Sequence, residues 1–219
     1  MVNTIVQIGE IVGTAAFALF GAMVAVERRM DLLGVLLLAV TTAVGGGMIR
    51  DVLLGATPPL ALQDPFFILI AMAVALLVFW ARSRKSPAQD GKFFRRLYSL
   101  AIFCDTLGLA VFTVTGVNRS IALGYGDNAF LSVFVGILTG VGGGVLRDVM
   151  ASRVPMILRK EIYAVASLAG GLLYYYLYWL AGEYIALFCG AAVIVVVRTV
   201  AVRYQLNLPV AKPKKEGGV

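Results

Sequence analysis

Histidine is absent from this 219-residue sequence, and charged residues make up only 14% of it. Without imidazole groups the chain has no histidine metal site and no histidine proton relay. The two cysteines, Cys104 and Cys189, each lie inside an apolar run, which is typical of packing residues rather than of a disulfide or redox pair. So little charge excludes a soluble enzyme, a secreted disulfide scaffold and a nucleic-acid binder. We expect no cofactor.

Apolar residues make up 60% of the sequence, more than one water-soluble core of this size could bury. Hydropathy divides the chain into seven apolar segments, each bounded by charged or turn residues, of which the third is short. The sequence therefore predicts an all-α polytopic membrane protein with seven transmembrane helices. The predicted spans are Ile5–Val26, Leu32–Leu54, Phe66–Ala81, Leu97–Val117, Asn128–Met150, Ile162–Leu180 and Tyr184–Val202.

The basic residues of the loops lie almost entirely on one side of this arrangement. If the N-terminus is outside, only Arg119 falls in an outer loop. The inner loops and tail then hold Arg28, Arg29, Arg82, Arg84, Lys85, Lys92, Arg95, Arg96, Arg153, Arg159, Lys160, Arg203, Lys212, Lys214 and Lys215. The positive-inside rule predicts a multi-pass protein of the cell inner membrane with an outer N-terminus and a basic cytoplasmic tail at 204–219. The net charge of +7 is thus a topology signal, and the inner face favours anionic membrane lipids.

A glycine-rich pattern occurs twice in the sequence. GGGMIRDV at Gly45–Val52 recurs as GGGVLRDV at Gly142–Val149, and Thr42 matches Thr139 at the same spacing. The first and fourth spans also align. There Glu10, Gly13, Phe17 and Gly21 match Asp105, Gly108, Phe112 and Gly116. Apolar helices often look alike by chance, but a shared GGGxxRDV with matched acids indicates an internal duplication.

The duplication predicts how the spans are arranged. Repeat 1 covers residues 5–81, repeat 2 covers residues 97–180, and a seventh helix at 184–203 lies outside both. Each repeat has three spans, an odd number, so the two copies must cross the membrane in opposite orientations. A pseudo-two-fold axis in the membrane plane follows. In transporters and channels built this way, the pathway lies near the interface between the repeats.

The two glycine triplets lie well inside the second and fifth spans. Each glycine in a helix interior costs about 1 kcal/mol relative to alanine, so three in succession predict a kink. A kink would free backbone carbonyls, which hydrocarbon tolerates only where protein or water meets them. We therefore expect the triplets to flank a pathway near the membrane midplane. The alternative is that they serve only close packing of helices.

An Arg-Asp pair follows each triplet, at Arg50–Asp51 and at Arg147–Asp148. One interpretation is that each arginine points back into the pathway and is held by its aspartate through charge-assisted bonds. The other is that it snorkels to the membrane surface from a helix end. The matched acids Glu10 and Asp105 are candidate functional residues, because intramembrane carboxylates are rare and costly. Alternatively, Glu10 is an acid of a first helical turn, and these acids are internal partners of the arginines.

With GGGxxRD in the second and fifth spans, seven spans and an inverted repeat, residues 5–205 resemble the prokaryotic branch of the TRIC family, the trimeric intracellular cation channels. The resemblance implies a symmetric homotrimer in which each protomer carries its own pore. It also implies that the second and fifth spans bend at their glycines and line this pore, which conducts monovalent cations such as potassium. Bacterial relatives are often named glycine transporters, which supplies a rival function.

The preferred hypothesis is a passive, potassium-permeable channel that is not an enzyme and holds no metal beyond transient monovalent cations. Carbonyl oxygens and small side chains suit a partly dehydrated potassium or sodium ion, and the arginines would act as gates or electrostatic barriers. The rival is a secondary transporter of glycine or a similar small solute, and a purely structural protein is the third reading. The predicted pathway residues are Thr42, Gly45, Gly46, Gly47, Arg50, Asp51, Thr139, Gly142, Gly143, Gly144, Arg147 and Asp148, with Glu10 and Asp105 as intramembrane acids.

Overall fold

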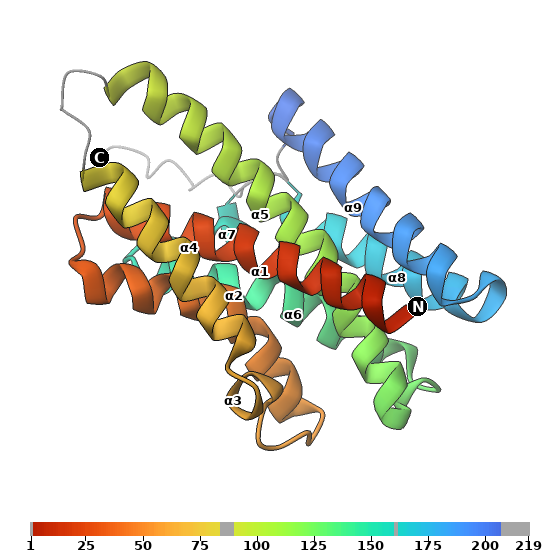
Figure 1. Ribbon diagram of the computed structural model, residues 1–219. Helices are drawn as coiled ribbons and strands as arrows, with labels where there is room; N and C mark the ends of the chain where they lie inside the picture. Colours follow the sequence, from red (N-terminus) through yellow and green to blue (C-terminus); the bar gives the residue numbers. More distant parts are fainter. Residues whose placement is uncertain (1, 84–89, 160–161, 207–219) are drawn as a thin grey trace, which may run out of the picture.

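The computed structural model describes residues 2–83, 90–159 and 162–206, which form helices joined by short loops (Figure 1). Six helices are long and apolar enough to cross a membrane, and α4 is a shorter apolar helix. The predicted all-helical membrane fold is therefore confirmed. The elements are α1 (Val2–Glu27), α2 (Leu32–Leu53), α3 (Leu60–Gln63), α4 (Phe66–Ser83), α5 (Asp90–Ser120), the π-helix η2 (Ile121–Tyr125), α6 (Ala129–Met150), α7 (Met156–Arg159), α8 (Tyr163–Ala181) and α9 (Glu183–Tyr204).

The predicted spans agree with these helices except at four places. One is the end of the fourth span, where α5 and η2 continue to Tyr125, past the predicted end at Val117. Helix α5 begins at Asp90, well before the predicted start at Leu97. The loops after α2 and α6 each contain a one-turn helix, α3 and α7, that hydropathy did not predict. Both are too short to give a periodic pattern. Loop residues 84–89 and residues 207–219 of the predicted basic tail lie outside the described residues.

The seven long helices form two groups of three and one addition. Helices α1, α2 and α4 pack on one another, and so do α5, α6 and α8. The groups join through α1 on α5 and α2 on α6, while α9 packs on α5 and α8 (Figure 1). Buried apolar side chains form one cluster centred on each group. This is the three-plus-three repeat with a seventh helix that the sequence predicts.

Matched residues of the two groups make matched contacts. The side chains of Asp31 and Asn128 cap α2 and α6, each accepting a hydrogen bond from a backbone N–H of the first turn, at 2.7 and 2.9 Å. The rings of Phe17 and Phe112, which align in the sequence repeat, pack on each other with centroids 5.2 Å apart. The interface between the repeats is thus built from equivalent residues of both.

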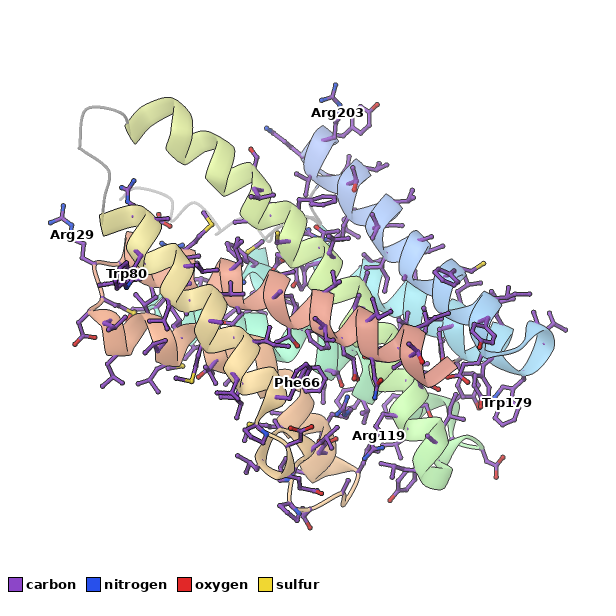
Figure 2. The ribbon with its side chains drawn as sticks, viewed as in Figure 1. Arg29, Phe66, Trp80, Arg119, Trp179 and Arg203 are labelled. Carbon is purple, nitrogen blue, oxygen red and sulfur yellow. The ribbon has the colours of Figure 1, made fainter. Side chains whose placement is uncertain are left out.

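Basic and aromatic side chains lie at both ends of the helices. Arg29 and Trp80 lie toward one end and Arg119 and Trp179 toward the other (Figure 2). Tryptophan is enriched where helices meet the membrane surface, so these positions agree with helices that cross the membrane. Which end faces the outside stays a prediction.

Candidate functional site

The glycine triplets face each other where α2 crosses α6. A methyl group on Gly46 would overlap the carbonyl oxygen of Thr139, and one on Gly143 would overlap the carbonyl oxygen of Thr42. A methyl group on Gly142 would lie 3.2 Å from the Cα atom of Gly46. The two helix backbones therefore touch at this point, and only glycine permits so close an approach.

Neither α2 nor α6 is interrupted at its triplet in the part of the chain that the structure describes. Each is one continuous helix, from Leu32 to Leu53 and from Ala129 to Met150. The continuous helices and the close contact fit the close-packing alternative, and the predicted kink at each triplet stays a prediction. Contact between the two backbones offsets the low helix propensity of glycine.

Thr42 and Thr139 lie on either side of this crossing, fully buried. Their hydroxyls donate to carbonyl oxygens one turn earlier in their own helices, at 2.5 and 2.7 Å. They also face Gly21 of α1 and Gly116 of α5, where a β-carbon would approach the hydroxyl oxygens to 2.6 and 2.7 Å. These threonines thus hold α2 against α1 and α6 against α5.

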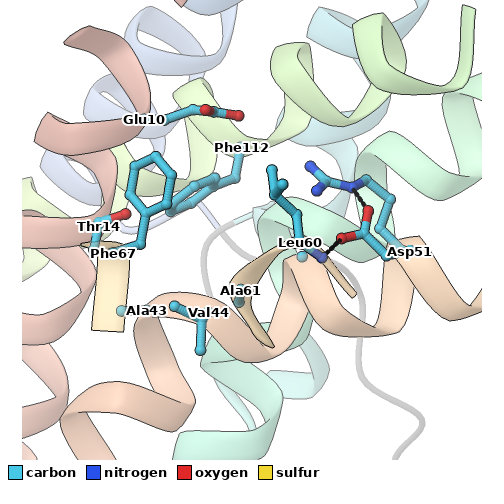
Figure 3. Close-up of a pocket in the computed structure, with 11 residues that line it drawn as sticks. Glu10, Thr14, Ala43, Val44, Asp51, Leu60, Ala61, Phe67 and Phe112 are labelled. Atoms are coloured by element: carbon cyan, nitrogen blue, oxygen red, sulfur yellow. Dashed lines mark hydrogen bonds and ion pairs between the residues drawn. The ribbon is translucent and has the colours of Figure 1, made fainter. Parts of the chain in front are cut away.

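Each Arg-Asp pair ties its long helix to the short helix that follows. In the first repeat, the Nε of Arg50 donates to Asp51 at 2.8 Å, and the second oxygen of Asp51 accepts from the backbone N–H of Leu60, the first residue of α3, at 2.9 Å (Figure 3). The guanidinium is held by its neighbouring aspartate, as one interpretation of the sequence expects. Arg50 is only 6% exposed, so it does not snorkel to water.

The second repeat makes the same bonds. The Nε of Arg147 donates to Asp148 at 2.9 Å, and Asp148 accepts from the backbone N–H of Met156, the first residue of α7, at 3.0 Å. Arg147 is 1% exposed. The aspartates therefore explain why a one-turn helix forms after each long helix, since they satisfy an N–H that would otherwise have no partner.

Arg147 also contacts α1 and α5, the first helices of the two repeats. Its Nη1 donates to the carboxylate of Asp105 on α5 at 3.0 Å, and its guanidinium stacks 4.0 Å above the ring of Phe20 on α1. The adjoining second-repeat cavity has only about 10 Å³, enough for about one water molecule. It is lined by Val141, Gly144, Val145, Arg147, Asp148, Met156, Ile157 and Tyr163.

In the first repeat, the matching arginine, Arg50, borders a larger cavity. A first-repeat cavity of about 50 Å³ lies beside Arg50, with Glu10 on its α1 side (Figure 3). Among the described residues, Arg50 pairs with Asp51 and forms no ion pair with Glu10. The cavity is lined by Glu10, Thr14, Ala43, Val44, Gly47, Arg50, Asp51, Leu60, Ala61, Phe67 and Phe112. Glu10 is half-buried, whereas Asp105 is fully buried.

Several residues at the two cavities were not predicted from the sequence. Phe67 and Phe112 form apolar walls of the first-repeat cavity, and Tyr163 lines the second. Phe20 contacts Arg147 from the other repeat. The alignment of Phe112 with Phe17 in the repeat was the one available signal. The others depend on which helices pack together, which a periodic pattern does not reveal.

Each comparison with known proteins matches most of the chain, although the names that they print differ. The family model described as glycine transporter matches residues 7–83 and 102–179. The UPF0126 inner membrane protein YadS of Escherichia coli (strain K12) is 40% identical over 205 residues, 91% of this chain and 93% of the relative. A structure of a TRIC cation channel superposes with a TM-score of 0.83 and 33% identity, covering 95% of this chain and 98% of that one. The TRIC trimeric intracellular cation channel orthologue from Rhodobacter sphaeroides superposes with a TM-score of 0.82 and 31% identity. The match covers 93% of this chain and 100% of that one.

Proposed function

The chain belongs to the prokaryotic TRIC family and matches the glycine transporter family model over most of its length, and we propose that it is a channel for monovalent cations, potassium included. It is a multi-pass membrane protein, as its apolar helices and its membrane-protein relatives indicate. The pathway runs within one chain, between the two repeats, so each protomer of the proposed homotrimer carries its own pore. The Rhodobacter sphaeroides orthologue is described as trimeric, which supports this assembly.

The two cavities and the crossing between them support such a pathway. The first-repeat cavity lies along the second half of α2 and the second-repeat cavity along the second half of α6. These helices run in opposite directions in an inverted repeat, so the cavities lie on opposite sides of the contact between Gly46 and Gly143. The proposed pathway would be closed at that contact and again at Arg147. Conduction requires the two helices to separate there, and glycine allows the necessary change of backbone angle.

The charges around the two cavities carry the proposal that the permeant ion is a cation. In the first-repeat cavity Arg50 lies with Asp51 and Glu10. In the second repeat Arg147 pairs with Asp148, which lines the cavity, and with Asp105, which does not. By its lining residues, the first-repeat cavity is therefore net negative when all of them are ionised. In the second repeat the charges balance, because the buried Arg198 stacks 4.5 Å over the ring of Tyr163. A net negative charge in a low-dielectric cavity attracts cations and repels chloride. The arginines then act as barriers inside a path that favours cations overall.

A planar bilayer experiment tests this function. Purified protein under a tenfold potassium chloride gradient should give unitary currents whose reversal potential approaches the cation limit of about 59 mV. Glu10→Gln removes one carboxylate and should move the reversal potential toward zero. Asp127→Asn, which removes an exposed acid from the turn before α6, should leave it unchanged. Silent bilayers, or currents carried by chloride, would contradict the proposal.

The second candidate function is secondary transport of glycine or a similar small solute, which the description of the matching family model favours. Inverted repeats occur in transporters as well as in channels, so the architecture does not separate the two. Uptake into liposomes does: gradient-coupled, saturable uptake of glycine by protein that is silent in bilayers would favour the transporter.

A further inference from the structure

The seventh helix places a buried arginine beside the second repeat. Helix α9 packs on α5 and α8, and its residue Arg198 is fully buried. The Cζ atom of Arg198 lies 4.5 Å from the ring centroid of Tyr163, the first residue of α8. Charged side chains within membrane helices are costly, so they commonly serve a function. Arg198 therefore adds a positive charge to the second repeat from a helix that belongs to neither repeat.

Tyr163 connects Arg198 to the charges of the proposed pathway. One face of its ring contacts Arg198, and the same residue lines the second-repeat cavity beside Arg147. A methyl group on Gly144 would lie 3.7 Å from the hydroxyl oxygen of Tyr163 and equally far from the Nη2 atom of Arg147. The charged groups that act on this hydroxyl are those of Asp105, Arg147 and Arg198. The three charges thus surround one aromatic side chain at the edge of the cavity.

We propose that Arg198 sets the unitary potassium current by cancelling the negative charge that the second repeat would otherwise offer to a cation. Arg147 pairs with the carboxylates of Asp105 and Asp148, so these three groups together carry one net negative charge when ionised. Arg198 brings the total to zero, whereas the first-repeat cavity stays net negative by its lining residues. This inference rests on the proposed channel function.

The first repeat has no equivalent of this arrangement at the matching position. In the alignment that matches the glycine triplets, the residue equivalent to Tyr163 is Phe66, whose side chain is 47% exposed. Tyr163, in contrast, is only 3% exposed and lies between the cavity and α9. The difference in charge between the two repeats therefore comes from the added helix.

An uneven charge along the pathway makes the second repeat the step that limits the current. A cation is stabilised by the negative first-repeat cavity and gains no such stabilisation in the neutral second repeat. Salt screens a buried charge such as that of Arg198 much less than an exposed one. The field of a unit charge extends over about 10 Å at an effective dielectric constant of about 20, so neutralising Arg198 should raise the unitary current by at least about twofold.

Unitary currents of the purified full chain in planar bilayers test this assignment. The two sides hold equal potassium chloride at about 1 M, where exposed charges are screened within about 3 Å. Arg198→Gln should raise the current, and Arg198→Lys, which keeps the positive charge, should stay close to the wild type. Arg203→Gln is the matched control, because Arg203 is exposed at the end of the same helix, and it should leave the current unchanged (Figure 2).

This measurement separates the proposed role from a purely structural one. A variant that folds less well gives fewer channels, but the current through each conducting channel is not reduced by that loss. If Arg198→Gln yields no folded protein, a pair of variants replaces it. Asp105→Asn alone should lower the unitary current, and Asp105→Asn together with Arg198→Gln should return it toward the wild type, because this pair restores the balance of charge.

The outcomes also separate this inference from the channel function. A conducting wild type with the same unitary current as Arg198→Gln would leave the channel standing and overturn the role of Arg198. An increase of equal size in Arg203→Gln, or a double variant that conducts like Asp105→Asn, would overturn it as well. If the wild type and all variants are silent, the channel function is wrong and this inference falls with it.

Discussion

Alanine in place of Gly46 should destabilise the folded protein, because a methyl group has no room there. It would overlap the carbonyl oxygen of Thr139, which belongs to a helix backbone and cannot rotate away. Helices α2 and α6 would have to move apart along a contact that both repeats share. Overpacking of this kind costs about 1–3 kcal/mol, and a clash with backbone lies at the upper end of that range. Alanine gains about 1 kcal/mol of helix propensity, so we expect a net loss of about 2 kcal/mol.

The neighbouring glycine supplies the control for this prediction. A methyl group on Gly47 would meet the Nη2 atom of Arg50 at 3.7 Å, an ordinary contact. Gly47→Ala should therefore keep the gain in helix propensity and be neutral or more stable by up to about 1 kcal/mol. The same contrast is expected between Gly143→Ala and Gly144→Ala in the second repeat. Unfolding of each purified variant in mild detergent, followed by circular dichroism, measures the difference. Equal stability of Gly46→Ala and Gly47→Ala would refute the argument that the helices touch at Gly46.

Three further outcomes are expected. Asp105→Asn leaves Arg147 with one carboxylate in a buried site and should lower the free energy of unfolding by about 3 kcal/mol. The same denaturation experiment measures this loss. A change as small as that of Asp127→Asn would show that this ion pair contributes nothing to stability. With both native cysteines replaced, a cysteine at position 127 should react with an impermeant maleimide on intact cells, and one at Arg29 should not; the reverse pattern would overturn the predicted topology. Native mass spectrometry in mild detergent should find a complex of three 23.4 kDa chains, and a monomer or dimer under every lipid condition would contradict the trimer.

The spans could be predicted from the sequence because hydropathy depends on local composition alone. The ends of α2 and α6 agree with prediction to within one residue, since charged and turn residues bound both apolar runs. Helices α3 and α7 could not be predicted in this way. Each begins where Asp51 or Asp148, from the preceding long helix, accepts a hydrogen bond from its first N–H. The hydrogen-bond partners are nine and eight residues apart across a loop, and hydrophobic periodicity gives no sign of such a contact.

The glycine triplets show where a local rule misleads. Helix propensity assigns a cost to three successive glycines, but the helices continue through both triplets because tertiary packing can override propensity. Here Gly46 and Gly143 each accept the other helix's backbone, which propensity cannot anticipate. The sequence does contain a signal for close packing, because Ala39 and Ala43 precede the first triplet, and Gly136 and Gly140 the second, at a spacing of four residues. The Arg-Asp pairs, in contrast, could be predicted as local pairs because the two residues adjoin in the chain.

Equal motifs in the two repeats do not produce equal sites, and the reason lies in the residues around them. Arg147 rests on the ring of Phe20, which brings its guanidinium to Asp105. In the alignment that matches Glu10 with Asp105, the residue equivalent to Phe20 is Thr115, which offers Arg50 no aromatic face. One substitution of this kind allows a duplicated arginine to be locked in one copy and to border a cavity in the other.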